Sequence, residues 1–266
     1  MDAINYLYAV ILGIVEGLTE FLPISSTGHL ILAKDLLGFD LPSANMFIVV
    51  IQLGAILAVC WLYRVKLLDV AFHLHKKPQQ MFVAKLFVAF LPAAVIGLAF
   101  HNFIEDVLFS PIVVAVSLIV GGLIIWLVER RIKPVAKTHD IESMSIKQSF
   151  LVGCAQVFSM VPGTSRSGAT IIGGMLFGLD RKIATEFSFF LAIPVMVGAT
   201  ILDVYKYYGS LSIEEVYVLV IGFVVSFMSA VAAIKFLIAY VAHHDFMVFA
   251  WYRIVVGTIM LAYFLI

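Results

Sequence analysis

Charged residues are scarce in this sequence. Only 13% of the 266 residues are Asp, Glu, Lys or Arg, 63% are hydrophobic, and the mean hydropathy is +1.09. A soluble domain of this length cannot bury so much apolar surface, which excludes a water-soluble globular protein and indicates an integral membrane protein. Basic and acidic residues balance at 17 each, so net charge argues neither for nor against nucleic acid, and no nucleic-acid partner is expected.

Cysteine is nearly absent, and no leader segment is recognisable at the N-terminus. Cys60 and Cys154 both lie in apolar runs, which favours packing roles over a disulfide or a metal site. The opening residues, MDAINYLYAV, lack the basic region and the small-residue cleavage site of a signal peptide. We expect them to belong to the mature chain.

Long apolar runs dominate the rest of the sequence. Six of them are long enough to cross a bilayer, which takes about 20 residues: 45–63, 81–100, 111–128, 187–204, 215–240 and 247–265. Two further apolar regions, 4–38 and 149–178, are interrupted by polar residues after a proline. Each predicts two short helices joined by a polar break, as in a re-entrant hairpin, because such breaks survive only against a protein-enclosed or watery cavity.

The loop charges predict an orientation. Lysine and arginine gather in loops 64–80, 129–148 and 179–186, whereas 101–110 has neither and 205–214 has one. The positive-inside rule puts the first three loops in the cytoplasm and the last two outside. This alternation fits six spans only if both broken regions return to the side they entered, and it places both termini outside.

Such a topology makes the chain two inverted halves, about 1–130 and 145–266, within one membrane domain. Each half holds one broken hairpin and three spans, and three is odd, so the second half is inverted. A shift of 140 residues lays Gly13, Glu16, Ser25 and Gly28 over Gly153, Gln156, Ser165 and Gly168. Inverted repeats with broken helices place their sites near the midplane, where the two breaks meet. The two polar clusters should therefore face each other.

The first cluster begins with a pair of glutamates, Glu16 and Glu20. Their spacing puts both carboxylates on one helical face, where two anions in low dielectric repel. A divalent cation between them, Mg²⁺ or Ca²⁺, or protonation of one carboxyl would relieve this repulsion. The alternative is a helix end whose glutamates reach interfacial water. Acids inside a membrane are usually functional, which favours the metal site.

Four further polar residues follow Pro23: Ser25, Ser26, Thr27 and His29. One of the hydroxyl residues is expected to be an N-cap of the next helix. His29 could be a general acid, a nucleophile or a metal ligand, or it could only bridge two helices.

The second cluster, PGTSRSGAT at 162–170, has the composition of an oxyanion cradle. Gly163 and Gly168 allow close approach of the backbone to a ligand, and the N–H groups that start the next helix favour an anion. Arg166 is suited to bidentate phosphate binding, although it could instead pair with a nearby glutamate. Three hydroxyl residues accompany it: Ser165, Ser167 and Thr170. Buried in an apolar protein, the two clusters together suit a phosphate carried on a lipid tail.

The stretches EGLTEFLPISSTGH and PGTSRSGAT, together with FSFFLAIPVMVGA and IQLGAILAV, resemble the undecaprenyl-diphosphate phosphatase family, the bacitracin-resistance phosphatases of the bacterial cell envelope. The resemblance implies hydrolysis of the C55 isoprenoid diphosphate to the monophosphate carrier for cell-wall polymers, in the bacterial inner membrane. It also implies a divalent metal, a site open to the outer face, and an all-helical fold of six transmembrane helices plus two re-entrant hairpins in an inverted repeat.

By motif position, the resemblance puts the family's glutamate pair on Glu16 and Glu20, its essential serine and histidine on Ser26 and His29, and its phosphate-binding arginine on Arg166. The attacking group stays open between Ser26, His29 and water, with His29 favoured as the group that acts on Ser26 or on the leaving oxygen. Metal identity, chain-length preference and homodimer formation also stay open.

Two other functions compete. Inverted repeats with broken helices are common in transporters, so a transporter or flippase of polyprenyl phosphate is the alternative. The type-2 phosphatidic-acid phosphatases also use Ser-Gly-His and Ser-Arg motifs, but here the sequence after Arg166 lacks their histidine.

Overall fold

The computed structural model describes residues 3–39, 44–103, 110–207 and 213–265, and apart from one isolated bridge between Thr138 and Leu179 their secondary structure is helical. The first half holds α1 (Ala3–Thr19), α2 (Ser26–Leu37), α3 (Ala44–Leu62), α4 (Arg64–Phe72), α5 (Lys77–Phe103) and α6 (Pro111–Leu127), which a π-helical turn extends to Ile132. The second holds α7 (Ile146–Val157), α8 (Arg166–Leu176), α9 (Arg181–Tyr207), α10 (Ile213–Val241) and α11 (Met247–Leu265).

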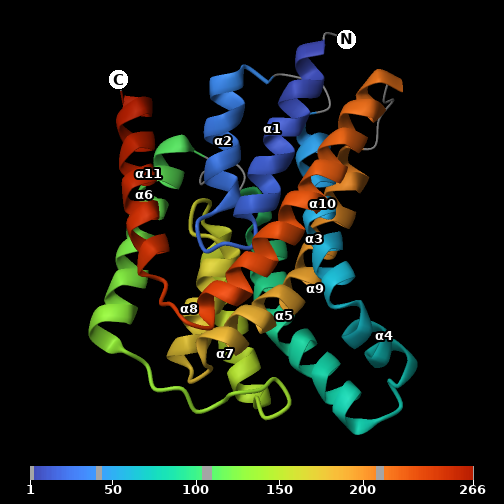
Figure 1. Cartoon of the computed structure of the whole chain (residues 1–266), viewed down its shortest axis with the longest axis vertical. Coiled ribbons are helices and arrows are strands. Elements are labelled where there is room, and N and C mark those ends of the chain that lie inside the picture. The colour runs from blue at the N-terminus through green and yellow to red at the C-terminus, as the bar shows by residue number, and fades with distance from the viewer. Residues whose placement is uncertain (1–2, 40–43, 104–109, 208–212, 266) are drawn as a thin grey trace.

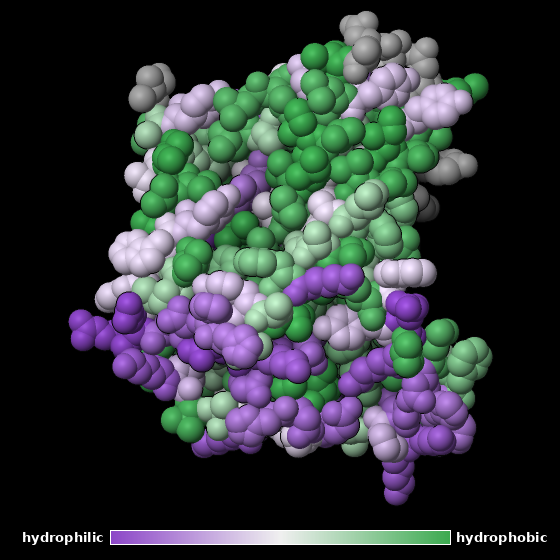
Figure 2. Space-filling model, viewed as in Figure 1, coloured by the Kyte–Doolittle hydropathy of each residue, from purple (hydrophilic) through white to green (hydrophobic). Residues whose placement is uncertain are grey.

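Most of these helices are long and apolar. Among the described residues, five are long and apolar enough to cross a membrane: Lys77–Phe100, Pro111–Ile132, Arg181–Ile201, Glu215–Val241 and Met247–Leu265. A sixth arises if α3 and α4, which meet at 76°, count as one span. The five helices correspond to five of the six predicted spans, and α3 covers the sixth, 45–63, so the chain is a polytopic membrane protein. Figure 2 shows the apolar surface over the upper and middle parts of the molecule and the polar surface gathered at its lower end.

Both polar breaks interrupt helices where the sequence predicts. The first break runs from Glu20 to the N-cap Ser25, and the second, after a 3₁₀ turn at Phe158–Met160, runs to the N-cap Ser165. Each N-cap hydroxyl accepts a hydrogen bond from the backbone N–H three residues on, in Gly28 and Gly168. Both serines have a positive φ, 70° and 74°, an uncommon conformation for a residue with a side chain.

The first helix of each broken pair packs on a long helix of the other half. Helix α1 packs on α10, and α7 packs on α5. The contacts are close because glycine is the residue at each crossing: a Cβ at Gly13 would lie 2.7 Å from the carbonyl oxygen of Gly222, and a Cβ at Gly153 would collide with that of Ala89. Figure 1 shows α1 and α2 in the upper part of the molecule and α7 and α8 in the lower part, so the two pairs approach the middle from opposite ends.

The remaining long helices enclose these two pairs. Helix α6 packs along α11 and α3 packs on α9. The main apolar core joins α3, α8 and α9 around buried phenylalanines, among them Phe187, Phe189 and Phe190. This core packs against both polar breaks, since it includes Phe21 and Ile24 of the first and Ile171 and Ile172 of α8.

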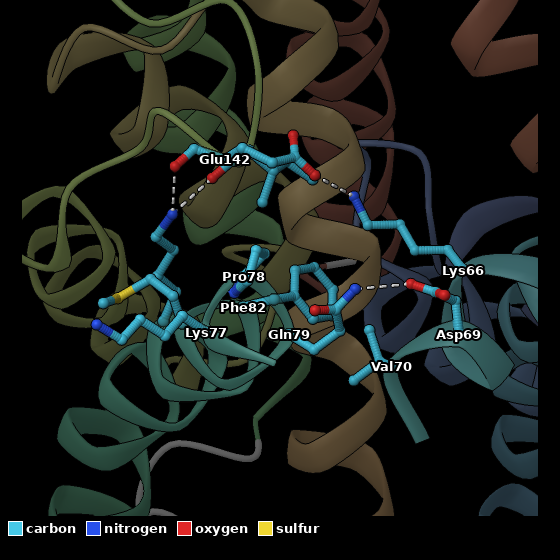
Figure 3. Close-up of a pocket in the computed structure, with 11 residues that line it drawn as sticks. Lys66, Asp69, Val70, Lys77, Pro78, Gln79, Phe82 and Glu142 are labelled. Atoms are coloured by element: carbon cyan, nitrogen blue, oxygen red, sulfur yellow. Dashed lines mark hydrogen bonds and ion pairs between the residues drawn. The ribbon is translucent and has the colours of Figure 1, made fainter. Parts of the chain in front are cut away.

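The lower, polar end of the molecule holds the loop between α6 and α7. The ammonium group of Lys85, which is 3% exposed, donates hydrogen bonds of 2.8 Å to the carbonyl oxygens of Ile141 and Glu142. The Glu142 carboxylate also pairs with Lys66 at 3.1 Å, across a cavity of about 430 Å³ that is lined mainly by α4 and the start of α5 (Figure 3). This cavity lies among the loops predicted to be cytoplasmic. The other two predicted loops, 101–110 and 205–214, lie mostly beyond the described residues, which leave out 104–109 and 208–212.

Candidate active site

A pocket of about 180 Å³ lies where the two polar breaks meet. The first break contributes its acid and hydroxyl groups, the second its arginine and glycine, and α3 and α9 close the sides. The lining residues are Glu20, Ser25, Ser26, Thr27, Gln52, Ser159, Pro162, Gly163, Ser165, Arg166, Val195, Met196 and Ala199. The prediction that the two polar clusters face each other is therefore confirmed.

Glu20 joins the two clusters. Its Oε1 accepts a hydrogen bond of 2.9 Å from Nη2 of Arg166, and its Oε2 accepts one of 2.6 Å from the hydroxyl of Ser26. Both partners of the ion pair are nearly buried, with side-chain exposures of 11% for Arg166 and 9% for Glu20. In this low-dielectric setting charged hydrogen bonds are short and strong, so Glu20 fixes the positions of both the cation and the hydroxyl.

Arg166 is held so that part of its guanidinium stays unused. Nη1 donates to the carbonyl oxygen of Ser188 at 2.9 Å, Nη2 bonds Glu20, and Nε has no partner among the described residues. A buried donor without a partner is costly, so Nε is a candidate donor to an oxygen atom of a ligand. The guanidinium also lies 5.9 Å from the ring centre of Phe21.

The start of α8 supplies the backbone part of the cradle. Ser165 caps the helix, and the hydroxyl of Ser167 donates to the carbonyl oxygen of Leu22 at 2.9 Å, which ties α8 to the first break. Gly163 has a φ of 92°, and a Cβ there would collide with the carbonyl oxygen of Val114. Only glycine fits this turn without strain, and the turn leaves the positive end of the α8 dipole directed at the pocket.

Glu16 is buried beneath this arrangement. The residue is 0% exposed, and neither of its carboxylate oxygens has a hydrogen-bond partner among the described residues. A carboxyl group in such a place needs a nearby cation if it is ionised, and otherwise it stays protonated. Among the same residues no three His, Cys, Asp or Glu side chains form a metal-binding group, so a metal here would need ligands from substrate and water.

His29 lies beside the pocket without lining it. Its Nδ1 is 2.8 Å from the carbonyl oxygen of Ser25, so Nδ1–H is the donor, and in the neutral ring Nε2 then accepts from the hydroxyl of Tyr252 at 2.7 Å. The His29 and Tyr252 rings are stacked at 5.6 Å with 9° between their planes. Both ring nitrogens are therefore occupied, and the hydroxyl of Ser26 is bonded to Glu20 instead.

Of the predicted site residues, seven line the pocket: Glu20, Ser25, Ser26, Thr27, Gly163, Ser165 and Arg166. Four others lie next to it: Glu16, His29, Ser167 and Thr170. Thr170 is 1% exposed and bonds the hydroxyl of Ser188 at 2.7 Å, which places it behind Arg166.

Several polar residues in or beside the site are not marked by any sequence motif. Gln52 and Ser188 stand alone in apolar runs, and Tyr252 and Arg253 lie together in α11. Arg253 is the one that sequence could have flagged, because an arginine in a transmembrane run marks function by default. The other three carry no charge, and an isolated amide or hydroxyl in an apolar helix is too common to single out.

Comparison with known proteins identifies relatives over nearly the whole chain. A family described as "Bacitracin resistance protein BacA" matches residues 9–259. The chain is 56% identical to an undecaprenyl-diphosphatase of Methylobacillus flagellatus, over 99% of this chain and 100% of that protein. It is 55% identical to an undecaprenyl-diphosphatase of Nitrosomonas europaea (98% and 95% covered) and 53% identical to undecaprenyl-diphosphatase 2 of Rhodospirillum rubrum (98% and 96%).

Proposed function

The chain belongs to the bacitracin resistance protein BacA family, and from this premise we infer that it hydrolyses undecaprenyl diphosphate to undecaprenyl phosphate and inorganic phosphate. It is a membrane phosphatase, and its product is the lipid carrier that cell-wall synthesis reuses. The observation that connects this activity to the structure is the Glu20 carboxylate, which binds Arg166 and Ser26 in one buried pocket.

The pocket offers donors that suit the oxygen atoms of a diphosphate. Arg166 offers its unpartnered Nε–H, and the first turn of α8 offers the positive end of its dipole. Ser25 and Thr27 also line the pocket. Phosphoryl transfer depends mainly on positioning and on stabilising charge, and this donor set supplies both.

Ser26 is the attacking group in the mechanism that the contacts support. Its Oγ would form a bond to the terminal phosphorus while its proton passes to Glu20 Oε2, which is 2.6 Å away. The bond from that phosphorus to the bridging oxygen breaks, and undecaprenyl phosphate leaves with that oxygen. Water then attacks the phosphoserine, releases inorganic phosphate and restores the Ser26 hydroxyl. His29, favoured by sequence as the partner of Ser26, would instead brace the turn through the Ser25 carbonyl.

Glu16 and Glu20 would hold a divalent metal, Mg²⁺ or Ca²⁺. The two unpartnered oxygens of Glu16 fit a hard cation that prefers oxygen ligands, and one or two carboxylates plus substrate phosphates are a common magnesium site. When bound, such a cation supplies positive charge that neutralises the phosphate oxygens.

The two broken helix pairs would be re-entrant hairpins in an inverted-topology repeat. The support is local: Ser25 and Ser165 are 140 positions apart, have φ of 70° and 74°, and cap α2 and α8 in the same way. The crossed packing of α1 on α10 and α7 on α5 has the same twofold relation. The protein would lie in the bacterial inner membrane, with its basic loops in the cytoplasm. Both termini and the opening of the site would then lie outside, as the positive-inside rule requires.

Release of inorganic phosphate from undecaprenyl diphosphate tests the activity. Purified protein in detergent should release phosphate, and Arg166→Ala should lose at least about 100-fold in kcat/KM because the buried diphosphate loses its cation. A wild-type protein that binds the lipid but releases no phosphate would favour the transporter alternative instead.

A further inference from the structure

Arg253 is a buried cation that the chemistry above does not use. It lies in α11 and is 1% exposed. Each of its five N–H donors points at a backbone carbonyl oxygen, at distances between 2.9 and 3.2 Å. A guanidinium has five such donors, so the hydrogen-bonding capacity of this side chain is filled without any carboxylate.

The five carbonyls come from three separate elements. Nη1 bonds Pro23 at 3.1 Å and Thr164 at 2.9 Å, so one nitrogen reaches both polar breaks. Nη2 bonds Gly163 at 3.0 Å, in the second break. The remaining two acceptors, Ser117 and Leu118, lie in α6 and hold the guanidinium against that helix. Pro23 and Gly163 are also 140 positions apart, so Arg253 contacts corresponding points of the two breaks.

Glycine in α6 makes room for this arrangement. A Cβ at Gly121 would collide with Nη2 of Arg253, and one at Gly168 would lie 3.3 Å from Nη1. The guanidinium therefore occupies a slot between α6 and the start of α8 that no larger residue at position 121 would leave open.

The contact with Thr164 bears directly on the phosphate cradle. The C=O of Thr164 and the N–H of Ser165 belong to one trans peptide unit and point in opposite directions. Because Arg253 draws that C=O toward itself, the N–H of Ser165 is directed away from the guanidinium, and Ser165 lines the pocket. Arg253 thus sets the direction of a backbone donor immediately before Arg166.

We propose that Arg253 is a positioning residue for phosphoryl transfer, which holds the break that carries Ser26 and the break that carries Arg166 in their working arrangement. The proposal rests on the phosphatase function above. This role differs from general packing, because Arg253 acts by fixing the turn at Ser165 and Arg166. Its loss should therefore lower kcat.

Two variants remove the five-carbonyl arrangement in different ways. Arg253→Lys keeps the charge but has three donors instead of five. Gly121→Ala leaves residue 253 unchanged but puts a methyl group in its slot, so the guanidinium must shift. The matched control is Gly257→Ala in the same α6–α11 contact, whose Cβ would lie 2.8 Å from the carbonyl oxygen of Ala115 and 3.0 Å from the Cβ of Leu118, with no Arg253 atom among its nearest neighbours.

The measurement is phosphate release against undecaprenyl diphosphate concentration, on protein that elutes as one species and has a measured Tm. We expect Arg253→Lys to lower kcat at least about 100-fold, because a misplacement of the reacting groups by about 1 Å can cost that factor. Gly121→Ala should lower kcat about 10-fold, because all five donors of Arg253 are still present. The KM of both should change less than about threefold, and Gly257→Ala should keep kcat within about threefold. If Arg253→Lys does not fold, Gly121→Ala and its control decide the question.

A double-mutant cycle separates positioning from packing. In an Arg166→Lys background, Arg253→Lys should cost less than about tenfold, because the group that it positions is already altered. The proposal would be overturned by an equal loss in both backgrounds or by a kcat of Arg253→Lys near that of the wild type. It would also be overturned if Gly257→Ala lost as much kcat as Gly121→Ala. A wild-type protein without phosphatase activity would overturn the proposed function and this inference with it, whereas an active wild type with an unaffected Arg253→Lys variant would overturn this inference alone.

Discussion

Replacing Glu20 by glutamine removes one charge and almost no volume. The glutamine oxygen can still accept from Arg166, but the amide nitrogen cannot accept the Ser26 proton. The pocket should therefore keep its shape while the Ser26 hydroxyl loses its base, at present 2.6 Å away, and the proposed metal site loses one of its two carboxylates.

The size of the effect follows from these contacts. General bases contribute about 10²- to 10⁴-fold, so kcat should fall by at least 100-fold, or about 2.7 kcal/mol of barrier. The ion pair with Arg166 becomes a hydrogen bond to a neutral amide and the hydrogen bond donated by Ser26 is lost, which lowers the free energy of unfolding by about 1–3 kcal/mol. Activity should thus decline far more than stability.

The matched control is Glu129→Gln. Glu129 is another buried glutamate that pairs with an arginine: Arg181 Nη2 lies 2.6 Å from its Oε2, and the N–H of Phe246 lies 3.0 Å from its Oε1. It lies at the start of the π-helical turn after α6, away from the pocket. Because Arg181 is 43% exposed, its pairing is partly screened, and the loss of stability should be about 1–2 kcal/mol.

The assay is phosphate release from undecaprenyl diphosphate, combined with thermal unfolding of the same preparations. We expect a large loss of kcat in Glu20→Gln, a kcat within about threefold of the wild type in Glu129→Gln, and similar decreases in Tm for both. A Glu20→Gln enzyme with more than about a tenth of the wild-type kcat would show that this carboxylate is not the base.

Three further predictions follow from single contacts. Glu16→Gln should raise the Mg²⁺ or Ca²⁺ concentration needed for half-maximal activity by about tenfold or more, since an unpartnered carboxylate is lost, and an unchanged metal titration would refute a cation at Glu16. Tyr252→Phe removes the hydroxyl group that donates to His29 Nε2, so kcat should fall about 3- to 10-fold. If His29 is instead the attacking group, the variant frees Nε2 and kcat should rise. Gly163→Ala should lower the free energy of unfolding by about 1–3 kcal/mol, because of its φ of 92° and the Val114 carbonyl, and an unchanged Tm would contradict this strain.

The sequence predicted the spans and the breaks well because both depend on local composition. Apolar runs of about 20 residues are recognisable without tertiary knowledge, and Pro23 and Pro162 mark where those runs cannot remain helical. The meeting of the two clusters was also predictable, because the loop charges and the odd number of spans per half left few other arrangements.

The partners within the site were less predictable. His29 looked like the natural partner of Ser26, yet Ser26 lies 2.6 Å from Glu20, six residues earlier, and His29 bonds Tyr252, 223 residues away. Contacts of that separation depend on how α2 rotates against α11, which no sequence spacing fixes. The metal and the attacking group stay predictions.

The pairing of Glu20 with Arg166 also has a consequence for biosynthesis. The two residues are 146 positions apart, and at about 5–20 residues per second Arg166 is made roughly 7–30 s after Glu20. Throughout that interval the nascent chain carries two acids in an apolar hairpin without their cation. Arg253, 230 positions after Pro23, is made later still. A chain that stalls before α11 would therefore contain every residue that lines the pocket but none of the Arg253 hydrogen bonds that join the two breaks.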